Sequence, residues 1–242
     1  MISQNQRVLV FSAHAADFCS RAGGTIMKFV EAGGTVHVHD LTYGERCEST
    51  ALWAREQKPT IEEVKEIRAG EIERASAIIG TTADCFDWGD SPLVIGAERE
   101  LHLLECIRAF KPDVILSHWK DDIMHPDHAE TTRAVIFASS YCGSGGIETA
   151  SEPCRRPTLY MYETTSGTAP VSRFLPDTFV DITDVFDRKR DALKELAAQP
   201  VLVGSYEVIG RYRAMEAGTT AGMGGCKYAE AFVKFGTSGG SA

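Results

Sequence analysis

Two short clusters of histidine and aspartate carry the side chains best suited to chemistry in this sequence. The first is His14-Ala-Ala-Asp17, which follows the apolar run at residues 7–12, and the second is His125-Pro-Asp-His128. Imidazole and carboxylate groups are ligands that Zn²⁺ accepts, and two histidines with one aspartate leave a fourth position open for water or substrate. Together the clusters predict a catalytic metal centre rather than a closed structural one.

Each cluster alone also has an ordinary structural explanation. A pair spaced as His14 and Asp17 is common, and Pro126-Asp127 is typical of a helix N-terminus, where the helix dipole favours an aspartate. Their occurrence together, each after a predicted strand, favours the metal centre. His118 either reaches the edge of the site or is a core histidine. The other histidines are assigned to packing or surface roles: His37, His39 and His102.

Alternating strand and helix patterns surround the two clusters. Short apolar or alternating runs predict strands at residues 7–12, 35–41, 84–88, 114–117, 158–162 and 179–182. Helices are expected at residues 17–31, 60–79, 97–110, 127–140, 183–198 and 204–217. This alternation predicts an α/β fold with a mainly parallel sheet. In such sheets ligands bind at the carboxyl ends of the strands, where both clusters fall.

Length and composition limit the class of protein. The chain has 242 residues, 43% of them hydrophobic and 24% charged, so we expect one globular domain over residues 1–235 and a flexible tail at 236–242. A formal net charge of −9 argues against nonspecific nucleic-acid binding. Seven scattered cysteines without a C-x-x-C pair argue against a disulfide framework. With no signal-peptide pattern and no membrane-spanning run, a cytoplasmic location is expected.

The paired clusters resemble those of the PIG-L/LmbE-like superfamily of zinc-dependent N-deacetylases. The resemblance rests on a strand followed by Ala-His-x-x-Asp, on the central His-Pro-Asp-His, and on the late segment at residues 228–232. It implies a Rossmann-like sheet with helices on both faces. It implies three zinc ligands: His14, Asp17 and His128. In addition, Asp127 would orient a catalytic histidine, and His125 would act as an acid or an electrostatic stabiliser.

One departure from this superfamily points away from amide hydrolysis. Its deacetylases typically read Ala-His-Pro-Asp-Asp-Glu, where the carboxylate before the ligand aspartate is the general base. This sequence has Ala16 at that position and Phe18 in place of the glutamate. Amide hydrolysis needs a base for water and an acid for the leaving amine. An alanine provides neither.

The sequence is similar to a hydratase branch of the same superfamily, whose zinc enzymes act on 4-oxalomesaconate in the breakdown of aromatic acids. The similarity lies in Ser-Ala-His-Ala-Ala-Asp-Phe, in the loop at residues 44–49, and in residues 176–183. It implies addition of water to an unsaturated 2-oxo di- or tricarboxylate, which needs a Lewis acid and a base but no leaving amine. Glu48 is the candidate base, and Arg46 is expected to pair with a substrate carboxylate.

Two other functions stay open on the sequence. One is an N-deacetylase of an acetylated sugar or related amide, with Glu48 replacing the missing base. The other is a non-catalytic metal- or metabolite-binding protein that lost its base at Ala16. Zinc is the expected metal, with iron and manganese as alternatives, because sites of nitrogen and oxygen ligands follow metal availability as much as affinity. The resemblance implies a homo-oligomer, a trimer or hexamer, with a small anionic substrate and no nucleic-acid or membrane partner.

Overall fold

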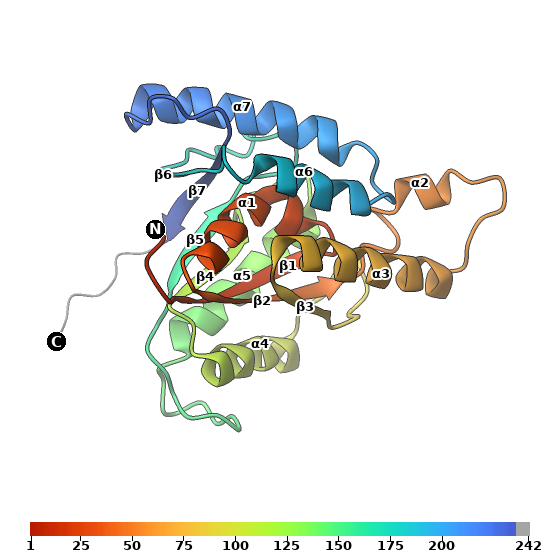
Figure 1. The fold of residues 1–242 in the computed structure, drawn as a ribbon. Coiled ribbons are helices and arrows are strands. Elements are labelled where there is room, and N and C mark those ends of the chain that lie inside the picture. The colour runs from red at the N-terminus through yellow and green to blue at the C-terminus, as the bar shows by residue number, and fades with distance from the viewer. Residues whose placement is uncertain (236–242) are drawn as a thin grey trace.

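A seven-stranded sheet runs through the centre of the protein in the computed structural model, which describes residues 1–235 (Figure 1). The strands are β1 (Arg7–His14), β2 (Thr35–Thr42), β3 (Thr82–Cys85), β4 (Val114–His118), β5 (Thr158–Tyr162), β6 (Thr178–Asp181) and β7 (Ala229–Phe235). Their order across the sheet is β3-β2-β1-β4-β5-β7-β6. The first five are parallel, and β7 is antiparallel to β5 and β6. This mostly parallel sheet confirms the predicted α/β fold.

Helices cover both faces of the sheet (Figure 1). The helices are α1 (Asp17–Glu31), α2 (Thr50–Trp53), α3 (Ile61–Ile79), α4 (Ala97–Phe110), α5 (Pro126–Tyr141), α6 (Phe186–Glu195) and α7 (Leu202–Thr220). α1, α3, α6 and α7 lie on one face, and α4 and α5 lie on the other. No helix within residues 1–235 is both long and apolar enough to cross a bilayer. The tail predicted at 236–242 lies outside the described residues.

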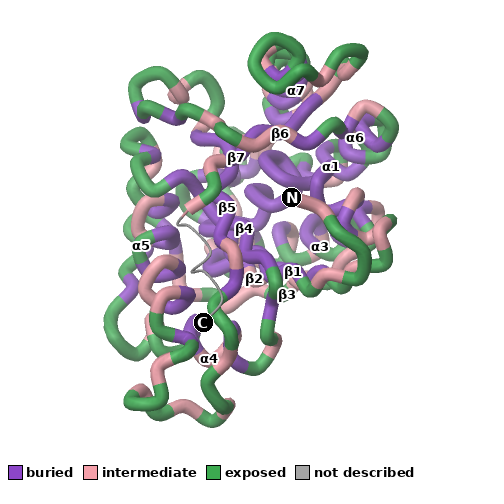
Figure 2. The backbone as a smooth tube through the Cα atoms, turned by 90° about the vertical axis from the view of Figure 1, so that its left-hand side faces the viewer, coloured by how far each residue is buried: buried purple, intermediate pink, exposed green. Residues whose placement is uncertain are grey.

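The central strands owe their position to continuous apolar runs. A parallel strand covered by helices on both faces is apolar along its whole length rather than at every second residue. β1 is buried from Val8 to His14, and β4 is buried throughout (Figure 2). Val8 and Val10 pack in the core on the α1 side, whereas Leu9 and Phe11 pack in the core on the α4 side. The two cores therefore hold the ends of β1 and β4 rigidly in the middle of the sheet.

Some predicted element bounds are wrong. The strand expected at 84–88 is β3, which ends at Cys85, because Asp87 has a φ of 54° and leaves the extended conformation. The helix expected at 183–198 is α6, which spans only Phe186–Glu195. The antiparallel strand β7 was not expected, since Glu230 interrupts its apolar pattern. That glutamate is buried, and its carboxylate accepts the Gly24 and Thr25 N–H groups.

Close packing of α1 against Ile182 makes Gly24 sensitive to substitution. A Cβ on Gly24 would lie 2.7 Å from Ile182 Cγ2, whereas a Cβ on the adjacent Gly23 would lie 3.5 Å from its nearest neighbour. We expect Gly24→Ala to lower the free energy of unfolding by about 1–3 kcal/mol. Gly23→Ala is the matched control and should raise it by up to about 1 kcal/mol, because alanine favours the helix. Urea denaturation measures both, and equal stability of the two variants would contradict the close approach.

Candidate metal centre

The two histidine-aspartate clusters meet at the carboxyl edge of the sheet, between β1 and β4. These two strands are neighbours in the centre of the sheet. β2 and β3 lie beyond β1 toward one edge of the sheet, whereas β5 lies beyond β4 toward the other edge. Such a reversal of strand order opens a crevice between the loops that leave the two strands. His14 ends β1 and Asp17 begins α1, while His128 lies in the first turn of α5. The topology therefore supplies all three side chains to one crevice.

His14 and Asp17 face each other at the junction of β1 and α1. Both side chains are buried, and His14 Nδ1 lies 3.3 Å from Asp17 Oδ2. The same oxygen accepts the backbone N–H of His14 at 2.9 Å, which fixes the turn between strand and helix. The other oxygen, Oδ1, pairs with the Arg21 guanidinium one turn along α1. The carboxylate is thus held from both sides, with Oδ2 directed to the imidazole.

His128 lies close to Asp17 and belongs to two groups of side chains whose ligand atoms could share a metal ion: His14, Glu48, His125 and His128, and Asp17, His118 and His128. Its Nε2 lies 3.6 Å from Asp17 Oδ2 and, although buried, has no hydrogen-bond partner within residues 1–235. Ligand atoms 2.0–2.2 Å from a tetrahedral ion lie about 3.4 Å from one another. The distances from Asp17 Oδ2 to His14 and His128, 3.3 and 3.6 Å, agree with that spacing. The donor types and these two distances therefore fit a zinc-like ion, and the choice of His14, Asp17 and His128 as its ligands stays a prediction.

A buried carboxylate contacts the second nitrogen of each of these histidines. Asp127 Oδ2 lies 3.3 Å from His14 Nε2, and Asp122 Oδ2 lies 2.9 Å from His128 Nδ1. Such partners take the N–H of a metal-binding imidazole and direct the lone pair of its other nitrogen to the ion. Asp127 was expected to orient a catalytic histidine, but the structure places its carboxylate against His14 rather than His125. This arrangement is typical of metal sites and gives Asp127 a positioning contact.

Asp122 was not singled out in the sequence, because its contact depends on the shape of the loop between β4 and α5. Its Oδ2 also accepts the Thr165 N–H at 2.8 Å and the Thr165 hydroxyl at 3.0 Å. We expect Asp122→Asn to weaken metal binding by about 10–100-fold, as loss of an outer-shell carboxylate typically does. Competition with a chelator measures this affinity. Asp121→Asn, at a half-exposed neighbouring position, is the matched control and should bind metal normally; equal affinities in the two variants would contradict the role of Asp122.

His118 is a buried histidine that also contacts the site. Its Nε2 lies 3.3 Å from Asp17 Oδ2 and accepts the Ala13 N–H at 2.8 Å. Burial lowers the pKa of His118, which keeps the ring neutral and able to accept this bond. Because the Nε2 lone pair is occupied by the Ala13 N–H, His118 supports the site rather than offering that atom to a metal. His118 is therefore both a core residue and a neighbour of the site, as each of the two predictions for it required.

Glu48 and His125 contact each other beside His14. Glu48 Oε1 lies 3.4 Å from His125 Nε2 and 3.6 Å from His14 Nδ1. Burial raises the pKa of Glu48, but His14 and His125 lower it further, so that it lies below its usual value. Burial lowers the pKa of His125, but contacts with Cys47 and Glu48 outweigh it and raise this pKa to about 9. At neutral pH the glutamate is therefore ionised and the imidazole protonated.

Arg46 lies on the same loop as Glu48, between β2 and α2. Its side chain is 50% exposed, and its Nη1 donates to the Asp90 carbonyl at 2.6 Å. The Asp90 carboxylate in turn accepts the backbone N–H groups of Arg46 and Cys47. The guanidinium is thus tied to the segment after β3 and remains open to solvent on its other side. Its pairing with a substrate carboxylate stays a prediction.

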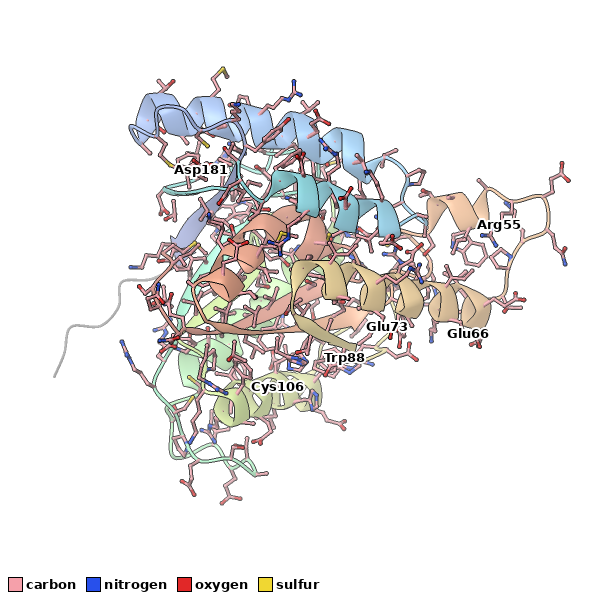
Figure 3. The ribbon with its side chains drawn as sticks, in the orientation of Figure 1. Arg55, Glu66, Glu73, Trp88, Cys106 and Asp181 are labelled. Atoms are coloured by element: carbon pink, nitrogen blue, oxygen red, sulfur yellow. The ribbon has the colours of Figure 1, made fainter. Side chains whose placement is uncertain are left out.

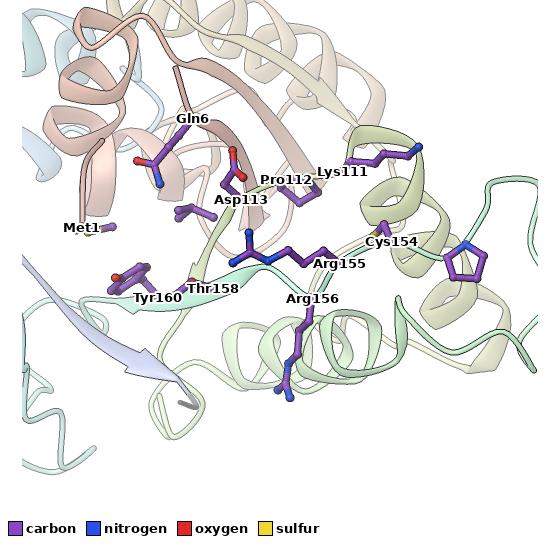
Figure 4. Close-up of a pocket in the computed structure, with 12 residues that line it drawn as sticks. Met1, Gln6, Lys111, Pro112, Asp113, Cys154, Arg155, Arg156, Thr158 and Tyr160 are labelled. Atoms are coloured by element: carbon purple, nitrogen blue, oxygen red, sulfur yellow. The ribbon is translucent and has the colours of Figure 1, made fainter. Parts of the chain in front are cut away.

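A separate cavity of about 490 Å³ lies at the opposite edge of the sheet (Figure 4). Arg155 lines it together with Asp113 and Thr158, which lie at the amino ends of β4 and β5. The five residues of β4 span ~17 Å between this cavity and the histidine crevice. A molecule in this cavity would not reach His14 or Glu48, so we assign it no part in the chemistry.

Comparison with known proteins identifies the family. The sequence profile of PIG-L, GlcNAc-PI de-N-acetylase, matches residues 9–139, a stretch that includes both clusters. The chain belongs to the PIG-L family. The predicted resemblance to this family is therefore confirmed.

Proteins similar to this chain include a hydratase and deacetylases. The chain is 32% identical to a 4-oxalmesaconate hydratase of Pseudomonas putida, over 92% of this chain and 85% of that protein. The crystal structure of GalB, the 4-carboxy-2-hydroxymuconate hydratase from Pseudomonas putida, superposes with a TM-score of 0.89 at 31% identity, covering 96% and 97% of the two chains. A 1D-myo-inositol 2-acetamido-2-deoxy-alpha-D-glucopyranoside deacetylase of Rhodococcus jostii is 25% identical over 83% and 84% of the chains.

Proposed function

We propose that this PIG-L family protein is a zinc-dependent hydratase that adds water to an unsaturated 2-oxo di- or tricarboxylate such as 4-oxalomesaconate. The single observation that carries the proposal is the side chain next to the metal-binding aspartate. Ala16 is 1% exposed and packs in the apolar core on the α1 side. A deacetylase of the family is expected to carry its general base there, whereas this site has its ionised carboxylate on Glu48. The similarity to the hydratase of Pseudomonas putida supports the same conclusion.

His14, Asp17 and His128 would hold the ion in this reaction. When bound, a divalent cation supplies Lewis acidity that stabilises negative charge on the oxygens of a 2-oxo acid. Arg46 pairs with a further substrate carboxylate. Asp122 and Asp127 keep the two imidazoles in orientation through their second nitrogens.

Glu48 and His125 move the protons of the reaction. Glu48 Oε2 is buried without a hydrogen-bond partner within residues 1–235, so it is free to accept a proton from water. The hydroxyl of that water forms a bond to one carbon of the double bond, and a proton is added to the other carbon. His125, protonated at neutral pH, stabilises the negative charge that develops on the substrate between these two events. No leaving group is needed, and the atoms of one water molecule are all retained in the product.

An N-deacetylase is the second candidate, and the Glu48–His125 pair is the observation that favours it. Amide hydrolysis needs a base for water and an acid for the leaving amine, and these two side chains lie 3.4 Å apart with the required protonation states. In that reaction Glu48 would replace the carboxylate absent at Ala16. The similarity to the deacetylase of Rhodococcus jostii, at 25% identity, supports this candidate.

A turnover assay on two substrates separates the candidates. Zinc-loaded protein is incubated with 4-oxalomesaconate, whose conjugated absorbance falls on hydration, and with an N-acetylglucosaminyl inositol, which releases acetate on deacetylation. We expect loss of absorbance with the first and no acetate from the second. Acetate release without hydration would establish the deacetylase instead. Turnover of neither substrate, nor of a wider panel of 2-oxo acids and acetamides, would make the protein a non-catalytic binder.

A further inference from the structure

A second cluster of metal-binding side chains lies on β2 and β3, outside the crevice. His37 and His39 are two residues apart on β2, and because side chains alternate along a strand they point to the same face. Strand register pairs His39 with Asp84 on β3 and pairs His37 with Thr82. β3 is the edge strand of the sheet, so the cluster has solvent on one side. It shares no residue with the crevice.

One ligand atom from each of these three residues lies within 4.8 Å of the others. His39 Nδ1 is 2.6 Å from Asp84 Oδ1, and His37 Nε2 is 3.3 Å from Asp84 Oδ2. The second of these distances already matches the spacing of about 3.4 Å around a tetrahedral ion. The distance from His39 Nδ1 to Asp84 Oδ1 is a hydrogen-bond length. Asp84 is 52% exposed, and a small rotation of its side chain would lengthen this distance to about 3.4 Å.

Neighbouring groups hold the two imidazoles in orientation. Thr82 Oγ1 lies 2.7 Å from His37 Nδ1, and when that nitrogen donates to the hydroxyl, Nε2 presents its lone pair to Asp84. Nε2 is thus the ring nitrogen of His37 that faces Asp84, and a bound ion would take the place of the proton between them. The ring of His39 stacks on Phe11 and packs against Phe86, with centroid distances of 5.6 and 4.8 Å. The Thr82 hydroxyl corresponds to the hydrogen-bond partner found on the second nitrogen of metal-binding histidines, whereas the two aromatic rings limit rotation of His39.

We propose that His37, His39 and Asp84 form a second site for a divalent transition-metal ion. Two imidazoles and a carboxylate are the ligands that Zn²⁺, Ni²⁺ and Cu²⁺ accept, and the exposed edge leaves the remaining positions to water. Phe86 and Phe110 flank the imidazoles, with ring centroids 4.8 Å from His39 and 6.3 Å from His37. Trp88, labelled in Figure 3, packs in turn against Phe86. This site stands independently of the function proposed for the crevice.

Metal at this site would join β2 to the edge strand β3, whose following segment supports the crevice. Asp90 in that segment accepts the backbone N–H groups of Arg46 and Cys47, and Ser91 donates its N–H to Asp127. An ion bound to the folded protein alone stabilises it by mass action. We therefore expect zinc at the second site to raise the melting temperature even when the crevice binds no metal.

Metal stoichiometry and thermal shift test the second site with the full-length chain. Protein stripped with a chelator is titrated with zinc, and the bound ion is counted by elemental analysis after desalting. We expect two equivalents in the wild type, one in His14→Ala/His128→Ala, one in His37→Ala/His39→Ala, and none when all four are replaced. In the His14→Ala/His128→Ala background, zinc should raise the melting temperature, and the shift should vanish when His37 and His39 are also replaced.

Two further variants guard against a loss of binding caused by misfolding. His102→Ala is the matched control, because this histidine packs against Phe86 and Trp88 beside the cluster without belonging to it. It should retain both equivalents. Asp84→Asn leaves both imidazoles in place and should weaken zinc binding at the second site by at least about 10-fold. One equivalent in the wild type and none in His14→Ala/His128→Ala would overturn the proposal.

Discussion

Replacing Glu48 with glutamine is expected to lower the rate of water addition by about 10²–10⁴-fold, the usual contribution of a positioned general base. The physical reason is that glutamine keeps the size and one oxygen of the side chain but accepts no proton at neutral pH. Glu48 lies 3.6 Å from His14 Nδ1, yet it is not one of the three proposed metal ligands. The variant should therefore keep its metal in the crevice while it loses turnover.

Glu45 on the same loop provides the matched control for this experiment. Its carboxylate is also buried, but Oε1 faces the Asp90 N–H at 3.4 Å rather than a histidine. Glu45→Gln keeps an oxygen for that contact and should retain most of the activity. Turnover is followed with 4-oxalomesaconate, and bound zinc is measured on the same samples. Full activity in Glu48→Gln would remove Glu48 from the mechanism, and loss of the ion would make it a metal ligand instead of a base.

The part of the crevice that could be predicted from the sequence is the part formed by residues at or just after the ends of strands. His14, Asp17 and His128 lie at the carboxyl ends of β1 and β4, or one turn into the helices after them, and parallel strands bring such positions to one edge. Apolar runs placed both strands in the centre of the sheet. The structure brings Asp17 into contact with both histidines, and the role of the three as zinc ligands stays a prediction.

Other parts of the crevice depend on loop conformation and on tertiary contacts, which sequence patterns do not specify. Asp122 reaches His128 only because the loop after β4 folds back and is held by Thr165. Asp127 contacts His14 from a helix more than a hundred residues away in the chain. A signal for Asp122 existed in the sequence, because an aspartate between a strand end and a metal-binding histidine is a natural outer-shell partner.

The strand β7 shows why the last part of the sheet was missed. Glu230 reads as a solvent-facing residue, but its carboxylate is buried against α1 and pairs with Lys189 Nζ at 2.6 Å. The lysine that pairs with this buried carboxylate is far away in the sequence, so the residues around Glu230 give no sign that it is buried. The assembly state, the cytoplasmic location and the extent of the domain stay predictions.

Replacing His128 with alanine is expected to abolish metal binding in the crevice and, with it, turnover of 4-oxalomesaconate. Two ligands hold an ion far less tightly than three, and the unpaired Nε2 of His128 is the atom best placed to bind it. The fold should survive, because Asp122 keeps its two hydrogen bonds to Thr165. Zinc is best counted in the His37→Ala/His39→Ala background, where only the crevice contributes.

His118→Ala provides the contrasting variant for this last experiment, because His118 is equally buried and stacks on His128 with a centroid distance of 4.0 Å. Its Nε2 accepts the Ala13 N–H and is therefore not available to the ion. We expect this variant to lose stability but to retain zinc, whereas His128→Ala should retain stability and lose zinc. The reverse result would assign the third ligand to His118, and it would move the metal toward β4 and away from Glu48. The same pair of variants therefore tests both the ligand set and the position of the proposed base relative to the ion.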